Sequence, residues 1–145
     1  VILWPGACNV HQRFRPEQVR AVRARLPGVR VLVHPECRAD VVALADAAGS
    51  TAFIVQRVAA APPGSRWAIG TESHLVERLQ RENPGQEIVS LSPVPAFCRT
   101  MSQITLANLA ATLESLVAGQ PLNRVTVAEE LAAPARLALE RMLAV

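Results

Sequence analysis

The chain has 145 residues, half of them apolar, and a formal net charge of +3 whose cations are all arginine, because the sequence contains no lysine. This length suits one compact domain with a trailing segment, and no apolar run approaches the roughly 20 residues that cross a bilayer. The arginines are scattered and the only aromatic side chains are two Trp and three Phe, whereas a nucleic-acid surface needs clustered cations and stacking aromatics. We therefore expect a soluble protein without a nucleic-acid or membrane partner.

The cysteine content and the first residues bear on location and completeness. Three cysteines without a secretory leader argue against a disulfide framework, so we expect a reducing, cytoplasmic location. The sequence starts at Val1, and the apolar run that ends at Trp4 begins as if a strand had been entered midway. We therefore expect a fragment whose site is completed by residues upstream.

Turn residues divide the first part of the chain into alternating apolar segments. The predicted strands cover residues 1–4, 29–33, 66–69 and 87–91, and the predicted helices cover residues 16–26, 39–48, 51–61 and 73–81. We expect Gly49 to end the second helix in the left-handed conformation, and Ser50 or Thr51 to cap the third. This alternation predicts a three-layer α/β/α fold with a four-stranded, mostly parallel sheet that is covered on both faces.

The character of the sequence changes near residue 100. A helix is predicted through residue 117, followed by a turn at 119–121, a short piece at 125–127 and a closing helix from about residue 128. We assign residues 1–100 to an α/β domain and residues 101–145 to a C-terminal helical segment.

Reactive side chains follow the predicted strands. They are Cys8, His34 and Glu36, Glu72, and Cys98. The carboxyl ends of parallel strands are where α/β sheets bind ligands, so these residues are expected on one rim. The two cysteines suggest that the site holds a metal centre.

Two Cys/His pairs leave a zinc-binding alternative open. Cys8 with His11, and His34 with Cys37, are each three residues apart, which suits two halves of a tetrahedral site in a small zinc-binding α/β module. However, side chains alternate along a strand, so Cys37 should point away from His34 and Glu36. A small buried hydrophobe is the favoured interpretation of Cys37, and His11 is as well explained by bracing the first loop.

Two predicted helix starts carry hydroxyl or acidic residues. Ser50 and Thr51 precede a helix whose free N–H groups could bind an anion, although taken alone they are more simply explained by an ordinary cap. Thr71 is the expected N-cap of the helix at 73–81, and Glu72 would be favoured there by the helix dipole.

Five ordered motifs together carry a family resemblance. They read WPGACNVH at 4–11, HPEC at 34–37, GST at 49–51, IGTE at 69–72 and CxxMxxITL at 98–106. With these motifs the chain resembles the carboxyl-terminal portion of quinolinate synthase, the A protein of bacterial NAD biosynthesis, along nearly its whole length.

The resemblance implies three similar α/β/α domains around a pseudo-threefold axis, each of which contributes one cysteine to a [4Fe-4S] cluster. It implies that Cys8 and Cys98 are two of those metal ligands, that Cys37 is not one, and that the third lies in earlier domains absent from this chain. The iron without a thiolate would act as a Lewis acid.

The resemblance also implies the reaction and the substrate site. Iminoaspartate, supplied by L-aspartate oxidase as functional partner, would condense with dihydroxyacetone phosphate to give quinolinate. His34 and Glu36 match the substrate-binding and acid–base pair, and Ser50 and Thr51 match residues that hold a substrate carboxylate. Ser102 stands where many members carry a basic residue. The fragment alone is expected to be inactive.

Overall fold

Four short strands, all parallel, organise the first part of the computed structural model, which describes residues 5–144. The order across the sheet is β2-β1-β3-β4. The predicted strand at residues 1–4 lies outside the described residues, and a two-residue strand takes the outer position beside β1. The bounds are Arg30–Val33 for β1, Ala47–Ala48 for β2, Arg66–Gly70 for β3 and Glu87–Ser90 for β4.

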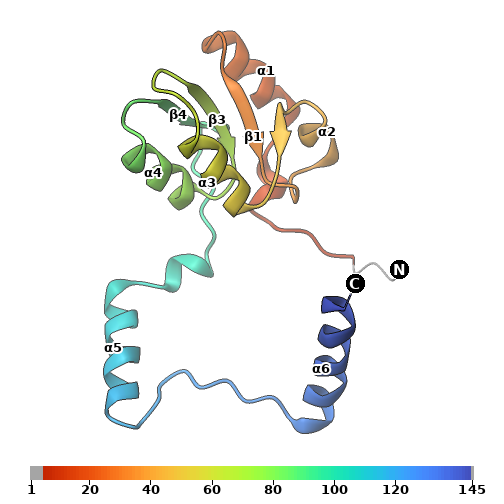
Figure 1. Ribbon diagram of the computed structural model, residues 1–145, viewed down its shortest axis with the longest axis vertical. Coiled ribbons are helices and arrows are strands. Elements are labelled where there is room, and N and C mark those ends of the chain that lie inside the picture. The colour runs from red at the N-terminus through yellow and green to blue at the C-terminus, as the bar shows by residue number, and fades with distance from the viewer. Residues whose placement is uncertain (1–4, 145) are drawn as a thin grey trace. The chain divides into compact units, whose positions relative to one another are not determined.

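Helices cover both faces of this sheet (Figure 1). Side chains alternate along each strand, so Val31 and Val33 of β1 pack on one face with α1 and α2, while Leu32 packs on the other with α3 and α4. Trp67 and Ile69 of β3 join the Leu32 cluster. The three-layer α/β/α prediction is therefore confirmed. The helices are α1 at Pro16–Arg25, α2 at Ala39–Val42, α3 at Thr51–Ala59 and α4 at Ser73–Glu82.

The predicted helix at residues 39–48 is wrong beyond its first turn. After α2 the main chain turns to pair with β1: the Asp46 N–H donates to the Val31 carbonyl at 2.9 Å, and the Asp46 carboxylate accepts from the Val31 N–H at 2.6 Å. Strand pairing with β1 thus outweighs the helix propensity of the alanines.

Gly49 is not in the left-handed conformation that we expected. It continues the extended path of β2, and its N–H donates to the Val33 carbonyl at 3.1 Å. Glycine is needed here for space, because a Cβ atom would lie 2.2 Å from the ring of Phe53. Ser50 does cap α3 as predicted, since its hydroxyl accepts from the Phe53 N–H at 3.3 Å.

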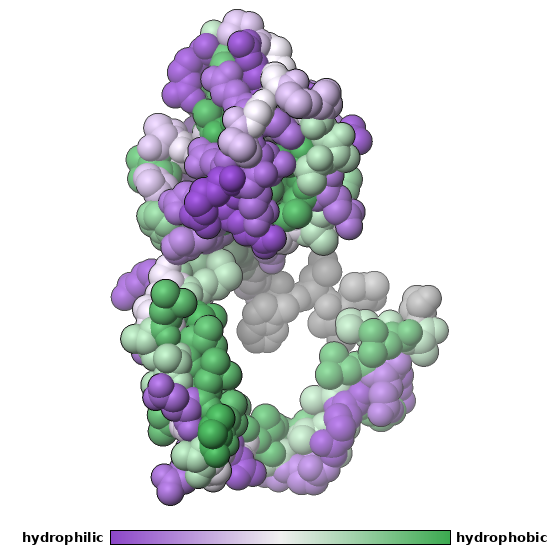
Figure 2. Space-filling view, turned by 60° about the vertical axis from the view of Figure 1, so that its left-hand side comes forward, coloured by the Kyte–Doolittle hydropathy of each residue, from purple (hydrophilic) through white to green (hydrophobic). Residues whose placement is uncertain are grey.

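The chain divides into two compact units, one ending at Ser102 and the other beginning at Gln103. The second unit contains α5 at Leu106–Val117 and α6 at Glu129–Leu143, while residues 125–127 form no helix or strand. Thr105 caps α5 by accepting from the Asn108 N–H at 3.1 Å. Exposed leucines run along α5, as the apolar side chains in Figure 2 show. None of the helices within residues 5–144 combines the length and apolar character needed to cross a membrane.

Candidate functional site

The strand ends of the first unit meet at one edge of the sheet. Backbone hydrogen bonds continue the strand pairing past the strands: the His34 N–H donates to the Gly70 carbonyl at 3.1 Å, and the Leu91 N–H donates to the Ile69 carbonyl at 3.0 Å. The residues that follow β1, β3 and β4 therefore start from the same rim, as the sequence predicted. The loop that carries Cys8 reaches this rim through His11, which begins the 3-10 helix η1 at His11–Arg13.

His11, His34 and Glu36 form the centre of the rim. The two imidazole rings stack with their centroids 4.3 Å apart and their planes 12° apart. A Glu36 carboxylate oxygen lies 3.2 Å from His11 Nδ1 and 3.5 Å from His34 Nδ1. Glu36 is thus close to both rings while its side chain is 57% exposed.

The hydrogen bonds of His34 indicate its tautomer. Its Nδ1 atom accepts the Glu36 main-chain N–H at 3.3 Å, so the proton of the neutral ring is on Nε2. His34 can therefore donate one hydrogen bond from Nε2 to a bound molecule.

His11 is the more buried of the two histidines, with 8% of its surface exposed. Burial, and secondly the neighbouring His34, lower the pKa of His11 below its ordinary value, so the neutral ring is favoured. Its Nε2 atom lies 3.1 Å from the Thr71 hydroxyl. Its Nδ1 atom makes no aligned hydrogen bond within the described residues, although Glu36 is close, and this leaves an electron pair or proton available at the rim.

Three potential metal ligands, one of them His11, lie close together. The ligand atoms of Cys8, His11 and Glu36 all lie within 4.8 Å of one another. Cys37 does not belong to this group: it is 5% exposed, its Sγ donates toward the Gly70 carbonyl at 3.5 Å, and burial raises its pKa to about 12. The prediction that Cys37 is a small buried hydrophobe is confirmed, and the four-ligand set of the zinc alternative is not assembled.

Cys98 lies in the loop after β4 and is partly exposed. Its Sγ atom is 3.1 Å from the Thr100 hydroxyl, whose hydrogen bond is the main reason that the pKa of Cys98 falls below its ordinary value. Cys8 and Cys98 both pack against the same hydrophobic cluster, which occupies one face of the sheet. Cys98 is not in the ligand group of Cys8, His11 and Glu36, so what the two predicted metal ligands share is contact with this cluster.

The turn after β3 links the two cysteine loops, and Glu72 in it is a residue whose role the sequence left open. The N-cap of α4 is Glu72 and not Thr71 as predicted, because one carboxylate oxygen of Glu72 accepts from the His74 N–H at 2.8 Å. The other oxygen accepts from the Cys98 N–H at 3.2 Å. Thr71 is instead free to contact His11. Ser, Thr, Asp and Asn are the usual residues at an N-cap. A Glu at this position is therefore the sequence signal that the side chain also binds another group, here the Cys98 N–H.

Ser50 and Thr51 occupy the start of α3, and both side chains are exposed. The Ser50 hydroxyl is engaged in capping. The Gly49 N–H bond to β1 places this helix start at the same sheet edge as His34. Within residues 5–144 no hydrogen bond joins Ser50 or Thr51 to His34 or Glu36.

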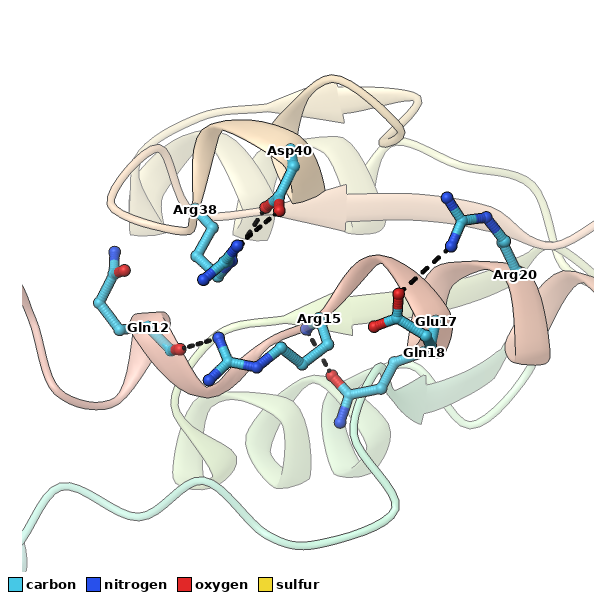
Figure 3. Close-up of polar contacts among 7 residues, drawn as sticks. All are labelled: Gln12, Arg15, Glu17, Gln18, Arg20, Arg38 and Asp40. Atoms are coloured by element: carbon cyan, nitrogen blue, oxygen red, sulfur yellow. Dashed lines mark hydrogen bonds and ion pairs between the residues drawn. The ribbon is translucent and has the colours of Figure 1, made fainter.

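The arginines beside the rim are held by neighbouring groups (Figure 3). Arg38 makes two hydrogen bonds to the Asp40 carboxylate, at 3.0 and 2.7 Å, and this guanidinium lowers the pKa of Asp40. Arg15 donates to the Gln12 carbonyl at 2.8 Å, and the Gln12 side chain donates to the Glu36 carbonyl at 2.9 Å. These contacts fix the loop of His11 against the turn that carries Glu36.

Comparison with known proteins places the chain in a family. The family described as "Quinolinate synthetase A protein" matches residues 1–144. Proteins named quinolinate synthase are similar throughout: the one from Geobacillus thermodenitrificans is 52% identical over 144 residues, and the one from Streptomyces coelicolor is 53% identical over 146 residues.

These alignments cover 99% of this chain but 39% and 37% of the two relatives. The relative from Rhodopirellula baltica gives the same result, with 52% identity over 100% of this chain and 37% of its own length. The chain therefore spans about two fifths of the length of the curated relatives. On the extent of the match, this chain belongs to the quinolinate synthetase A protein family.

Proposed function

We propose that the complete protein is a cytoplasmic quinolinate synthase of NAD biosynthesis, and that this chain supplies two of its three cluster ligands together with part of its substrate site. In the proposed reaction iminoaspartate, supplied by L-aspartate oxidase, condenses with dihydroxyacetone phosphate to give quinolinate. The observation that carries the proposal is the rim itself, where Cys8 lies close to His11 and Glu36 and from which the chain after β4 leads to Cys98. The names and the identity of the relatives support the same reaction.

The donor set fits a [4Fe-4S] cluster, which is held by cysteine thiolates. Cys8 and Cys98 are partly exposed, and the lowered pKa of Cys98 favours its thiolate. Cys37 is buried and its Sγ donates toward the Gly70 carbonyl, so this thiol does not face the rim where iron would bind. Two ligands from this chain and one from another part of the complete protein would hold the cluster, which when bound supplies a Lewis acid at its remaining iron.

His34 and Glu36 are proposed to bind substrate and to move protons. The His34 Nε2–H can donate to a substrate oxygen, because its Nδ1 atom is occupied by the Glu36 N–H. The exposed Glu36 carboxylate can accept a proton, and His11 Nδ1 at 3.2 Å is the neighbouring ring nitrogen with which it can exchange one. Stacking on the buried His11 ring holds the His34 ring in position on the rim.

The start of α3 is proposed to hold a substrate carboxylate. Free N–H groups at a helix N-terminus and the positive end of the dipole favour an anion. The Thr51 hydroxyl adds a donor at this point, whereas the Ser50 hydroxyl would have to leave its capping bond to Phe53 to contribute. The position of this helix start at the sheet edge of His34 supports a shared site.

Anaerobic reconstitution of the full-length protein with iron and sulfide tests the proposal. We expect Cys8→Ser and Cys98→Ser each to lose the visible absorption of the cluster and the formation of quinolinate. Cys37→Ala is the matched control and should keep both. A Cys8→Ser or Cys98→Ser protein that retained cluster and turnover would refute the ligand assignment.

A zinc site is the second candidate, because Cys8, His11 and Glu36 offer the sulfur, nitrogen and oxygen donors that zinc accepts. Metal analysis of protein purified without added metal separates the candidates. Stoichiometric zinc that is lost in His11→Ala, with no iron chromophore after reconstitution, would favour zinc. Iron with acid-labile sulfide would exclude it.

A further inference from the structure

We propose that Glu72 is a positioning residue that holds Cys98 for metal binding, and that the turn Thr71-Glu72-Ser73 fixes the loops of Cys8 and Cys98 relative to each other. The inference rests on the proposed function for its metal, but the hydrogen bonds that connect this turn to the two cysteine loops are present in the chain without metal. It assigns a role to three buried polar residues at the end of β3.

The first step concerns the loop of Cys98. The Ser73 N–H donates to the Ala96 carbonyl at 3.2 Å, and the Ala96 N–H donates to the Ser73 hydroxyl at 2.7 Å. Two residues later, the Cys98 N–H donates to the Glu72 carboxylate at 3.2 Å. This loop has no strand or helix between β4 and η2 at Met101–Gln103, so these bonds tie the Cys98 backbone directly to the turn after β3.

The second step concerns the loop of Cys8. The Thr71 hydroxyl contacts His11 Nε2 at 3.1 Å, and the Cys8 carbonyl accepts the Gln12 N–H at 3.0 Å, which closes the turn between Cys8 and His11. Thr71 and Glu72 are adjacent in sequence and both are buried, with 3% and 7% of their surface exposed. Each therefore holds one cysteine loop from a common, rigid strand end.

The third step explains why residue 72 is Glu. An aspartate is among the preferred N-cap residues and would carry the same charge at the start of α4. A glutamate side chain is longer by one carbon–carbon bond of about 1.5 Å, and this length allows one oxygen to cap the His74 N–H while the other reaches Cys98. The glutamate oxygen that reaches Cys98 also accepts from His74 Nδ1 at 2.9 Å, which orients the carboxylate. Capping α4 alone does not require a glutamate, whereas binding the Cys98 N–H at the same time does.

The variant Glu72→Asp separates the two roles in the full-length protein. It keeps the charge and the cap, so the thermal unfolding midpoint and hydrogen exchange in α4 should stay close to those of the wild type. The amide of Cys98 loses its charge-assisted acceptor, and we expect its hydrogen exchange in the metal-free protein to accelerate about tenfold or more. Glu82→Asp, an exposed change at the end of the same helix, is the matched control and should alter neither quantity.

The metal is tested in a second arm by following the release of iron from reconstituted protein to a chelator. We expect Glu72→Asp to release iron about tenfold faster than the wild type and than Glu82→Asp. Unchanged exchange at Cys98, or faster exchange with unchanged iron release, would overturn the positioning role while leaving the proposed function intact. A wild-type protein that binds no cluster would instead overturn the proposed function, and the positioning of Cys98 for metal with it.

Discussion

Selective alkylation of the three cysteines tests the assignment of Cys8 and Cys98, rather than Cys37, as metal ligands. The thiolate is the reactive form, and an ordinary thiol with a pKa of about 8.5 is about one quarter ionised at about pH 8. With its pKa raised to about 12, Cys37 is ionised in only about one molecule in ten thousand at that pH. The thiolate population of Cys37 is therefore roughly two-thousandfold smaller than that of an ordinary thiol, and although a thiolate of higher pKa is more nucleophilic, Cys37 should still react far more slowly, with its limited access adding to the difference.

The assay treats metal-free, folded protein with iodoacetamide at about pH 8 and quantifies each labelled cysteine by mass spectrometry. Cleavage at arginine places Cys8, Cys37 and Cys98 on separate peptides. Cys98 should label first, because the Thr100 hydroxyl lowers its pKa, and protein unfolded in urea should label all three at similar rates. If Cys37 reacted within about tenfold of the rate of Cys98 in the folded protein, the argument from burial and thiolate availability would be wrong.

Three further predictions concern stability and turnover. Gly70→Ala should lower the free energy of unfolding by about 1–3 kcal/mol in urea titrations, because its Cβ would lie 2.8 Å from the buried Val33 side chain. Gly85→Ala is the control, since its Cβ would meet nothing nearer than 3.6 Å. Equal losses of stability in the two variants would contradict the packing argument. Glu36→Gln should keep the cluster of the full-length protein but lose most turnover, and unchanged activity would remove its acid–base role. Because the pKa of His11 is lowered in the folded state, the unfolded state takes up more protons below about pH 6.5, so the free energy of unfolding should fall as the pH drops through that value. His11→Gln should flatten this part of the pH profile, and a profile identical to that of the wild type would show that another group causes it.

Much of the α/β unit could be predicted from local sequence. Buried β-branched runs define β1, and apolar residues at helical spacing define α1 and α4 with ends within one or two residues of the predicted ones. These elements are decided mainly by which side chains face the core, and that information lies in their own periodicity. The parallel sheet then follows from the alternation of strands with helices.

The predictions were wrong at positions where a contact with a residue distant in sequence or with a neighbouring side chain sets the backbone conformation. Nothing local in residues 39–48 shows that the main chain at Asp46 will pair with Val31, so alanine content alone favoured a longer helix. Gly49 was interpreted through its conformational freedom, whereas its real constraint is the ring of Phe53 against its Cα. In both cases the deciding partner is a specific atom that periodicity does not describe.

In the candidate site, likewise, the positions of reactive residues could be predicted from the sequence, whereas the hydrogen bonds between distant residues could not. The positions of His34, Glu36 and Cys98 after predicted strands were enough to predict one rim, because parallel strands share their carboxyl edge, whereas the strand predicted before Cys8 lies outside the described residues. The bond between Glu72 and Cys98 spans 26 residues of sequence and joins a side chain to a backbone amide, so no spacing rule could predict it. The sequence does contain one sign of such a bond, which is a glutamate at an N-cap position where the shorter aspartate would be enough to cap the helix. A buried glutamate at a helix start beside a ligand-bearing loop is therefore better tested first as a positioning residue, by shortening it to aspartate, than as an acid or base.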